Sequence, residues 1–571
     1  MSDRPPLGQL VGIWNLITRL HRITLTTALM LGIIQSVIGV VRAEDRSIDG
    51  SGNNVSNTHW GAVGTQLRRV APDDYADGLS ALAGASRPSA REVSNTVGAQ
   101  TSPTVNGHGM TAMVWQWGQF LDHDIDLTVG SGESADISIP TGDPYFDPFN
   151  TGTQVLHFTR SNYDPATGTV DPRQQVNSIT AYIDASNVYG SDAVRAAALR
   201  TGIGGKLKTD LNGLLPKNTS LLPNANDGMF NDEDMFLAGD IRANEQVGLT
   251  SMHTLFMWEH NRLADEIAIA NPSWTDDQIY QRARKIVGAE LQVITYDEFL
   301  PALLGPSAPG LLSTYDPSLS AGIANEFSTA LYRLGHSMIG GDLLRVKPDG
   351  TVAPGGSLPL RDAFFNPTVL TSADEVEFIL NGLTKEMAQE LDVKVIDDLR
   401  NFLFGPPGSG GLDLLSLNLQ RGRDHGLADY NSVRVAYGLD PVATFADITS
   451  DVDLQLDLQS LYGNVDDIDL WVGALAEDHL PDSSLGELLS TAIIDQFVRL
   501  RDGDRFWYRN DPEFSASDIA ALEATSLSDV IMRNTAMEGM RHHIMTVPEP
   551  SALTFALLAI ASGCVLRRRS D

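Results

Sequence analysis

Apolar residues recur at intervals of three and four positions in six long segments, the spacing that places them on one face of an α-helix. The segments are Met110–Leu121, Leu249–Ile269, Asp277–Leu300, Ala324–Met338, Ser372–Glu390 and Leu485–Leu500. The alternation typical of strands is scarce, and no internal repeat or Pro/Ser-rich linker divides the chain. Residues 44–106 are rich in Gly, Ser, Asn and Asp, which indicates an extended arm with turns. We therefore predict one mainly α-helical domain over residues 44–546.

The first part of the chain has a different pattern. Basic residues within 19–22 precede an apolar run over residues 23–41, and Val41-Arg42-Ala43 has the small residues that signal peptidase prefers. We predict a signal peptide over residues 1–43 and export of the mature protein. An uncleaved anchor is the alternative, because the run approaches the roughly 20 residues of a membrane span.

The C-terminal segment, residues 547–571, resembles the PEP-CTERM sorting tag of Gram-negative bacteria. Pro548-Glu549-Pro550 leads into an apolar stretch over residues 552–566, and arginines follow at 567–569. The resemblance implies an exosortase-type processing enzyme as a partner, and a location outside the cell or in the cell envelope. We expect contact with a membrane only through the two terminal segments.

Composition narrows the possible functions. The chain of 571 residues carries 73 acidic and 40 basic side chains, a formal net charge of −33. This balance argues against nucleic acid as a partner, because phosphates require clustered Lys and Arg. The only cysteine, Cys564, lies in the C-terminal segment. No intramolecular disulfide can form, so the core, a metal or a cofactor must stabilise the protein.

The densest polar motif is the ten-residue stretch Trp117–Asp126. On a helix, Gln119 and His123 share a face, while Asp122 and Asp126 form a like-charge pair that costs roughly a few tenths of a kcal/mol. A bound cation or a covalent modification of one carboxylate would compensate this repulsion. The motif therefore indicates a functional site rather than a solvated surface.

Two further polar motifs contain histidine. His336 ends the motif Arg333-Leu334-Gly335-His336, and the cluster Asn418–Gly426 follows an apolar stretch. Each motif is weak evidence alone, because a lone histidine on an apolar helix is more often a core residue than a ligand. A haem would account for two histidines together, with one on the iron and the other moving a peroxide proton.

Five ordered blocks resemble the animal-type haem peroxidase family, also called the peroxidase–cyclooxygenase superfamily. The blocks are Trp117–Asp126, Thr180–Gly190, Arg242–Leu255, Arg333–His336 and Asn418–Gly426. The similarity extends from Ser47 to Trp507. It implies a mainly α fold with a single large haem-peroxidase domain of the myeloperoxidase-like type.

The resemblance assigns a role to each residue of the site. His123 corresponds to the distal acid–base, Arg242 to the distal cation and Gln119 to the distal glutamine that orders water. His336 corresponds to the proximal ligand of the haem iron, and Asn418 to its hydrogen-bond partner.

The resemblance also implies how haem b is held. Arg333 and Arg421 correspond to partners of the haem propionates. Asp122 and Glu245 correspond to the carboxylates that become ester-linked to haem methyls in mammalian secreted peroxidases. Gln246 stands where myeloperoxidase has the methionine of a sulfonium link, so the chain is more similar to lactoperoxidase. We expect up to two ester bonds and no sulfonium bond.

A calcium site is implied by the same family. Its expected ligands supply oxygen from side chains and carbonyls, and they are Asp124, Thr180, Tyr182, Asp184 and Ser186. An EF-hand is the competing interpretation, because Asp122, Asp124, Asp126 and Glu133 fit four of its positions. It is disfavoured because Leu127 stands where the turn requires Gly.

The function implied is that of a secreted peroxidase. It would reduce hydrogen peroxide and oxidise halides, thiocyanate or small phenols through a ferryl haem intermediate. One alternative is a fatty-acid dioxygenase of the cyclooxygenase branch, whose radical tyrosine lies three residues before the proximal histidine. Here that position is Arg333, and Tyr332 would be turned away by about 100 degrees on an α-helix. The other alternative is a non-catalytic adhesive matrix protein, which predicts erosion of the site residues.

Overall fold

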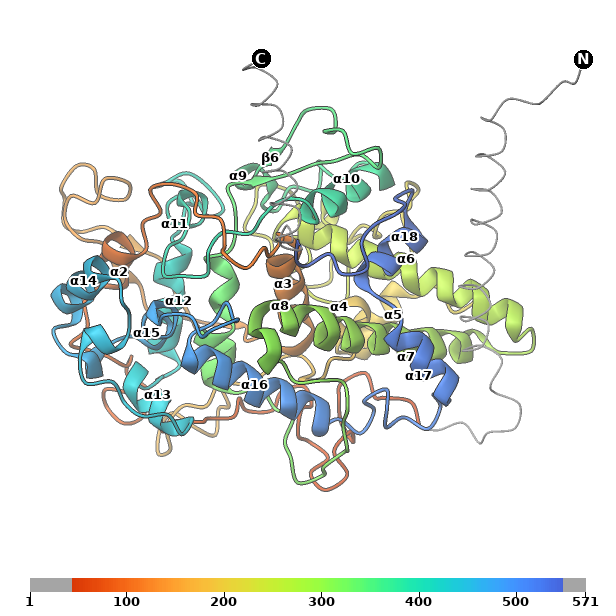
Figure 1. Ribbon diagram of the computed structural model, residues 1–571, viewed down its shortest axis with the longest axis horizontal. Coiled ribbons are helices and arrows are strands. Elements are labelled where there is room, and N and C mark those ends of the chain that lie inside the picture. The colour runs from red at the N-terminus through yellow and green to blue at the C-terminus, as the bar shows by residue number, and fades with distance from the viewer. Residues whose placement is uncertain (1–43, 548–571) are drawn as a thin grey trace, which may run out of the picture.

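Helix α3 (Met113–Ile125) crosses the centre of the protein and is enclosed by elements from distant parts of the chain. The computed structural model describes residues 44–547. Figure 1 shows α3 between α12 (Leu414–Asp424) on one side and α6 (Val247–Ala270) on the other. Trp117, Phe120 and Leu121 of α3 are fully buried. This helix therefore carries the densest polar motif of the sequence into the interior.

The remaining helices surround this centre, and many are short. The other α-helices are α2 (Ala90–Val97), α4 (Ser186–Tyr189), α5 (Ala193–Leu199), α7 (Asp276–Ile294), α8 (Leu300–Leu304), α9 (Leu360–Ala363), α10 (Ala373–Leu383), α11 (Asp397–Arg400), α13 (Tyr430–Ala436), α14 (Val452–Tyr462), α15 (Leu470–Ala476), α16 (Glu487–Asp502), α17 (Ala516–Glu523) and α18 (Leu527–Asn534). The π-helical segments are η2 (Thr295–Phe299) and η4 (Phe327–Leu331). The 3-10 turns are η1 (Asp232–Asp234), η3 (Gly305–Ser307), η5 (Arg333–His336), η6 (Phe445–Asp447) and η7 (Val465–Asp467).

Strands are few and lie in small antiparallel pairs. Within residues 44–547 the sheets pair β1 (Gly130–Ser134) with β4 (Thr159–Ser161), β2 (Ile137–Ser138) with β3 (Val155–Leu156), and β5 (Asp342–Leu343) with β6 (Leu358–Pro359). None of these short pairs could form a core by itself. The predicted mainly α-helical domain is confirmed.

Three of the six predicted helices are present as single α-helices with shifted ends, namely α3, α6 and α16. The segment predicted over Asp277–Leu300 is helical throughout, but it is α7 as far as Ile294 and then the π-helical η2, before α8 begins. The prediction for Ala324–Met338 was wrong, because this segment forms η4 followed by η5. Apolar spacing of three and four fits π and 3-10 turns as well as α-helix, so periodicity did not separate them. The helix predicted to reach Glu390 ends at Leu383, because later residues pair with the N-terminal arm instead, as in the bridge between Gln389 and Val105.

The N-terminal arm is tied to the helical core by a buried ion cluster. Arg91 on α2 has no exposed surface, and its guanidinium donates to Asp143 and to Asp413 at 2.7 Å each. Asp413 is the N-cap of α12, so this cluster fixes the arm to a helix near the site. Such buried pairs and the extensive apolar core take the place of disulfides in this part of the chain.

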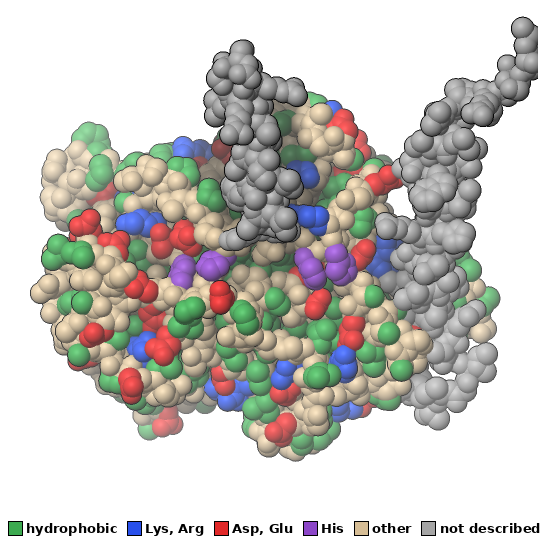
Figure 2. Space-filling view, in the orientation of Figure 1, with side chains coloured by type: hydrophobic (Ala, Val, Ile, Leu, Met, Phe, Trp, Pro, Cys, Tyr) green, Lys and Arg blue, Asp and Glu red, His purple; other side chains and the backbone are tan. Residues whose placement is uncertain are grey.

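The surface carries charges of both signs. Figure 2 shows acidic and basic side chains interspersed over the visible face, without a basic stripe. Within residues 44–547 no helix has the length and apolar composition needed to cross a membrane. The predicted signal peptide and nearly all of the predicted sorting segment lie outside the described residues.

Candidate active site

A cavity of about 240 Å³ is lined by residues of α3, of the segment that precedes α6, and of η5. Seven residues predicted from the sequence line it: Gln119, Asp122, His123, Arg242, Glu245, Arg333 and His336. Most of the remaining wall is apolar, including Trp115, Phe299, Leu403 and Phe404. The fold therefore brings separate sequence motifs together in one site.

His123 lies in the last turn of α3 and is almost fully buried. Its Nδ1 lies 3.4 Å from Asp240 Oδ1, and its Nε2 lies 3.7 Å from Glu245 Oε2. Burial, with the positive charge of Arg242, lowers the pKa of His123 well below its ordinary value. The imidazole is therefore neutral at physiological pH and has a nitrogen that can accept a proton.

Arg242 is held by Asp240, a residue outside the motifs that the sequence predicted. The guanidinium donates from Nε to Asp240 Oδ1 at 2.9 Å and from Nη2 to Oδ2 at 3.0 Å, a bidentate pair. Burial opposes the charge of Arg242, but Asp240 outweighs it and raises the pKa of Arg242. The sequence offered one indication of this pair, which is that the acidic Asp240 stands two positions before Arg242.

Arg242 also connects its segment to α3. Its Nη2 donates to the carbonyl oxygen of Asp126 at 2.7 Å, and its Nη1 lies 3.3 Å from Asp122 Oδ2. Burial, with the nearby charge of Asp126, raises the pKa of Asp122 to about 7. The repulsion predicted between these two acids is therefore present. Burial likewise raises the pKa of Glu245 to about 7, against the opposing charge of Arg242.

A cluster of glutamine amides fixes the orientation of Gln119. The amide of Gln119 donates to Glu245 Oε2 at 3.1 Å, and Gln246 donates to Gln119 Oε1 at 3.0 Å and to Gln116 Oε1 at 2.7 Å. A Cβ at Gly248 would lie 2.5 Å from the Gln116 oxygen, so only glycine leaves room for this arrangement. Gln116 was not predicted, although it lies one helical turn before Gln119.

His336 reaches the cavity from η5. Burial, with the charge of Arg333, lowers the pKa of His336 to about 3, so the imidazole is neutral and can ligate a metal. The buried amide of Asn418, on α12, lies 2.9 Å from His336 Nδ1. With the amide rotated so that its oxygen accepts Nδ1–H, Nε2 is left free for iron. The donor set therefore fits a haem.

The two arginines predicted to bind propionates lie in different places. Arg333 lines the cavity, and in the unrotated orientation of the Asn418 amide its Nη1 donates to Asn418 Oδ1 at 3.3 Å. The rotation that frees His336 Nε2 gives up this hydrogen bond. Arg421 donates to Ser161 Oγ at 2.8 Å, and its guanidinium lies 4.2 Å from the centre of the Phe158 ring. It is not among the residues that line the cavity. The propionate role of Arg421 stays a prediction that this geometry does not support.

The residues predicted to bind calcium lie beside α3. Asp124 Oδ2 accepts hydrogen bonds from the backbone N–H groups of Asp184 and Ala185 at 3.1 Å. Asp184 Oδ1 accepts from the Thr180 hydroxyl at 3.1 Å, whereas its Oδ2 is buried without a hydrogen-bond partner. Burial, with the charge of Asp184, raises the pKa of Asp124 to about 8. A cation would satisfy these crowded carboxylates.

The other predicted calcium ligands would contribute oxygens without charge. The Ser186 hydroxyl donates to the Asp124 carbonyl at 2.8 Å, and the Tyr182 hydroxyl donates to the Trp60 carbonyl at 2.6 Å. Tyr182 could therefore offer only its backbone carbonyl. Over residues 44–547 no three His, Cys, Asp or Glu side chains are grouped as metal ligands.

The loop that carries Asp184 also positions the catalytic elements. Asn187 donates to the Phe120 carbonyl of α3 at 2.7 Å, and its own carbonyl accepts from the Asp240 N–H at 3.0 Å. A Cβ at Gly239 would overlap the Ser186 carbonyl, so this close approach requires glycine. The loop thereby sets the position of Asp240 relative to α3.

Tyr332 lines the cavity, contrary to the expectation that it would be turned away. The expectation assumed an α-helix, whereas Tyr332 lies between η4 and η5. Its ring stacks on Phe327 with 4.6 Å between centroids, and its buried hydroxyl has no hydrogen-bond partner.

Comparison with known proteins identifies this arrangement. A family model described as animal haem peroxidase matches residues 45–545. The chain belongs to the animal haem peroxidase family. Membership confirms the predicted enzyme class, a haem-dependent peroxidase, and implies haem as its cofactor.

Relatives of this peroxidase differ in how much of their own length it covers. Peroxinectin A from Dictyostelium discoideum is 38% identical over 512 residues, which cover 87% of this chain and 94% of that relative. A peroxidasin homolog from Mus musculus is 37% identical, with 86% of this chain and 36% of that relative covered. Thyroid peroxidase from Sus scrofa is 35% identical, with coverage of 86% and 59%.

Solved structures confirm the fold of this peroxidase. Peroxidase A from Dictyostelium discoideum aligns with a TM-score of 0.82 at 36% identity, over 89% of this chain and 100% of that one. A fatty acid alpha-dioxygenase from Arabidopsis thaliana aligns with a TM-score of 0.75 at 19% identity, over 92% and 89% of the two chains. At that identity the second comparison shows a shared fold alone.

Replacing Asp240 with Asn should destabilise this peroxidase by about 3 kcal/mol, because a buried arginine loses its charge partner. Urea unfolding monitored by circular dichroism measures the change. The control, Asp265→Asn, removes an ion pair with Lys206 in which the Asp265 side chain is 60% exposed, and should have little effect. Equal stability of the two variants would contradict the role given to Asp240.

Proposed function

We propose that this protein is an exported haem peroxidase that reduces hydrogen peroxide and oxidises halides, thiocyanate or small organic donors such as phenols. The observation that supports it most directly is the cavity shared by His123, Arg242 and His336. One neutral imidazole suits iron ligation, and the other suits proton movement beside a fixed positive charge.

The haem would be held by residues of η5 and α12. His336 would ligate the iron through Nε2, Asn418 would accept its Nδ1–H, and Arg333 would pair with a propionate. The bound haem supplies the redox chemistry with peroxide. Trp115, Phe299 and Leu403 offer apolar surface for a macrocycle and limit access of water.

His123 and Arg242 have different roles in breaking the peroxide O–O bond: proton transfer and charge stabilisation. His123 takes a proton from one peroxide oxygen and returns it to the other, which leaves as water. Arg242 stabilises the negative charge that develops as the O–O bond breaks. Asp240 holds Arg242 in place, and Gln119 orients water or a small donor beside His123.

Fatty-acid dioxygenation is the second candidate, because Tyr332 lines a largely apolar cavity. It is less well supported, since Arg333 occupies the position where that branch of the superfamily has its radical tyrosine. A purely adhesive role is not favoured, because His123, Arg242 and His336 share one cavity.

Replacing His123 with Ala should slow the reaction of the haem-loaded protein with peroxide by at least about a hundredfold, the scale of a lost general acid–base. Stopped-flow absorbance of the haem band measures the rate. His157→Ala is the control, because the His157 side chain is 86% exposed and remote from the cavity lining. Equal rates for the two variants would remove His123 from the mechanism.

We also propose that calcium binds Asp124 and Asp184, with hydroxyl and carbonyl oxygens of Thr180, Tyr182 and Ser186. Elemental analysis should find calcium in active protein, and chelation should change the haem spectrum because the loop positions α3. Lowering the pH should release calcium, since burial raises the pKa of both carboxylates and protons then compete with the metal. Active protein without calcium would refute the site.

A further proposal concerns covalent attachment of the haem. Asp122 and Glu245 line the cavity, and esterification of either would remove a negative charge from a crowded group of acids. After exposure to peroxide, peptide mass spectrometry should find haem on one or both peptides, and acid–solvent extraction should leave haem on the protein. Asp122→Asn with Glu245→Gln should release it completely. Unmodified peptides and full extraction from the wild type would refute the ester bonds.

Export and sorting are proposed from the terminal segments. The mature protein should lack residues 1–43 and should reach the cell envelope or the medium, and the segment after Pro550 should be required for sorting. Intact mass of protein recovered from the envelope decides both points. A full-length chain with both termini would contradict the processing while leaving an anchored peroxidase possible.

A further inference from the structure

A continuous series of aromatic rings leads away from the cavity wall. Tyr332 contacts Phe497 with 5.9 Å between ring centroids, and Phe497 contacts Tyr296 at 6.0 Å. Tyr296 packs edge-on against Trp507 at 4.9 Å, and Trp507 lies 5.1 Å from Tyr508. The series joins η2, the Tyr332 turn, α16 and the segment before α17, which are far apart in the sequence. We call these five residues the ring chain.

Four members of the ring chain are tyrosine or tryptophan, the aromatic side chains that lose one electron most readily. These four side chains differ in whether a hydrogen-bond partner can accept the proton that is released when the ring is oxidised. The Tyr332 hydroxyl and Trp507 Nε1 are buried without hydrogen-bond partners, and the Tyr296 hydroxyl donates to the Phe497 backbone carbonyl. None of these three sites offers a base.

Tyr508 has the partner that the other members lack. Its hydroxyl donates to the carboxylate of Glu523 at 2.7 Å. An oxidised phenol is strongly acidic, so a carboxylate in this position can take the proton and leave a neutral radical. Within the ring chain, a radical is therefore most stable on Tyr508.

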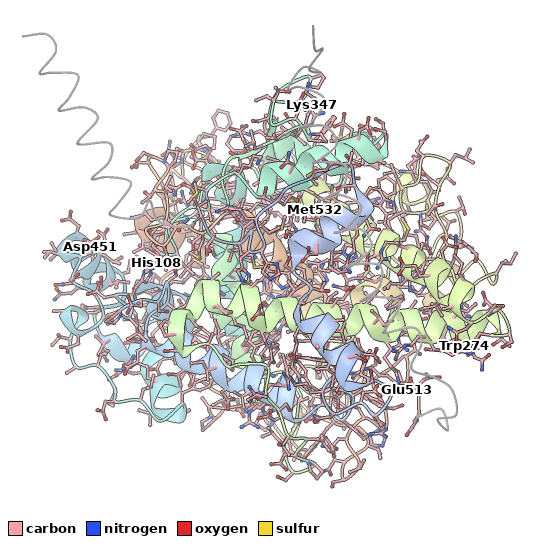
Figure 3. The ribbon with its side chains drawn as sticks, turned by 45° about the vertical axis from the view of Figure 1, so that its right-hand side comes forward. His108, Trp274, Lys347, Asp451, Glu513 and Met532 are labelled. Carbon is pink, nitrogen blue, oxygen red and sulfur yellow. The ribbon has the colours of Figure 1, made fainter. Side chains whose placement is uncertain are left out.

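The far end of the ring chain lies just beneath the surface. Tyr508 is fully buried, but Glu523 and Arg509 form an ion pair over its hydroxyl, with side chains 23% and 28% exposed. Glu523 ends α17, which packs against α7, and Figure 3 shows these helices side by side with Glu513 at one end of α17. A donor on this face would be separated from the Tyr508 ring by only one layer of side chains.

We propose that Tyr508 is a radical site through which the protein oxidises phenolic donors too bulky to enter the cavity, such as tyrosines of other proteins. The inference rests on the proposed peroxidase function, because peroxide reduction at the haem supplies the oxidising equivalents. An electron passes from Tyr508 along the ring chain to the oxidised haem site, and the hydroxyl proton moves to Glu523. A phenolic donor then gives one electron to the Tyr508 radical, Glu523 returns the proton to the Tyr508 oxygen, and the donor's own proton enters the solvent. The haem site takes up one proton from solvent for each electron it receives, so one hydrogen peroxide and two phenols yield two waters and two phenoxyl radicals.

A second aromatic cluster lies near the cavity, but it does not provide a comparable radical site. Trp117 contacts Phe120 and Phe256, and Phe120 contacts His253, all of them fully or almost fully buried. Trp117 Nε1 donates to the Thr295 hydroxyl, which is no base. This group contains one readily oxidised ring and no carboxylate, so it does not compete with Tyr508.

Electron paramagnetic resonance of the haem-loaded protein, frozen after mixing with peroxide in the absence of donor, tests the radical site. We expect a tyrosyl signal in the wild type that narrows when the protein contains ring-deuterated tyrosine. Tyr508→Phe should lose this signal, and Glu523→Gln should weaken it by removing the base. Tyr145→Phe is the matched control, because Tyr145 also donates to a carboxylate, Asp397, yet packs on Phe402 outside the ring chain. A signal unchanged in Tyr508→Phe would overturn the proposal.

Steady-state oxidation of a free phenol and of the same phenol attached to dextran tests the donor site. Tyr508→Phe should retain the rate with the free phenol and lose the rate with the attached phenol, while Tyr145→Phe retains both. Equal loss or equal retention of the two rates in Tyr508→Phe would contradict the surface site. Failure of the wild type to oxidise the free phenol, iodide and thiocyanate would instead refute the proposed function.

Discussion

The charge balance around Arg242 is the constraint on which the rest of the site depends. Asp240 binds its guanidinium in a bidentate pair, Asp122 lies within 3.3 Å, and the Asp126 carbonyl accepts a further hydrogen bond. These contacts join the segment before α6 to α3 and hold a positive charge beside His123. Burial, with this charge, lowers the pKa of His123 and keeps the imidazole neutral. The loop that carries Asp184 is hydrogen-bonded through Asn187 to both α3 and Asp240. The expected metal site is therefore directly connected to the residues that line the cavity.

Much of the fold and the site could be predicted from the sequence. Amphipathic spacing predicted α3, α6, α7 and α16, and the ordered motifs predicted which residues of α3, η5 and α12 would meet. Asp240 was not predicted, because its role depends on the hydrogen bonds of its carboxylate with the Arg242 guanidinium. No sequence motif marks that contact. Tyr332 was misplaced because apolar periodicity does not distinguish an α-helix from a π-helical segment followed by a 3-10 turn. Arg421 matched a motif, yet its guanidinium packs on Phe158 instead of lining the cavity.

The cavity and the ring chain together suggest two separate ways to reduce the oxidised enzyme. In the proposed function, small donors would reach His123 and Gln119 directly in the cavity. Larger donors would act at a distance, through residues whose contacts belong to the hydrophobic core. The same buried aromatic rings, Trp507 and Tyr508 among them, would then serve both stability and electron transfer.

The central claim is that His336 ligates haem in the cavity that His123 and Arg242 share. The most direct measurement compares electron paramagnetic resonance and absorption spectra of the haem-loaded wild type and His336→Ala, each with and without added imidazole. The wild type should show a histidine-ligated ferric haem that added imidazole does not alter on the His336 side. The variant should lose that signature and regain it when imidazole enters the space left by the side chain. An identical spectrum in His336→Ala without imidazole would contradict the account.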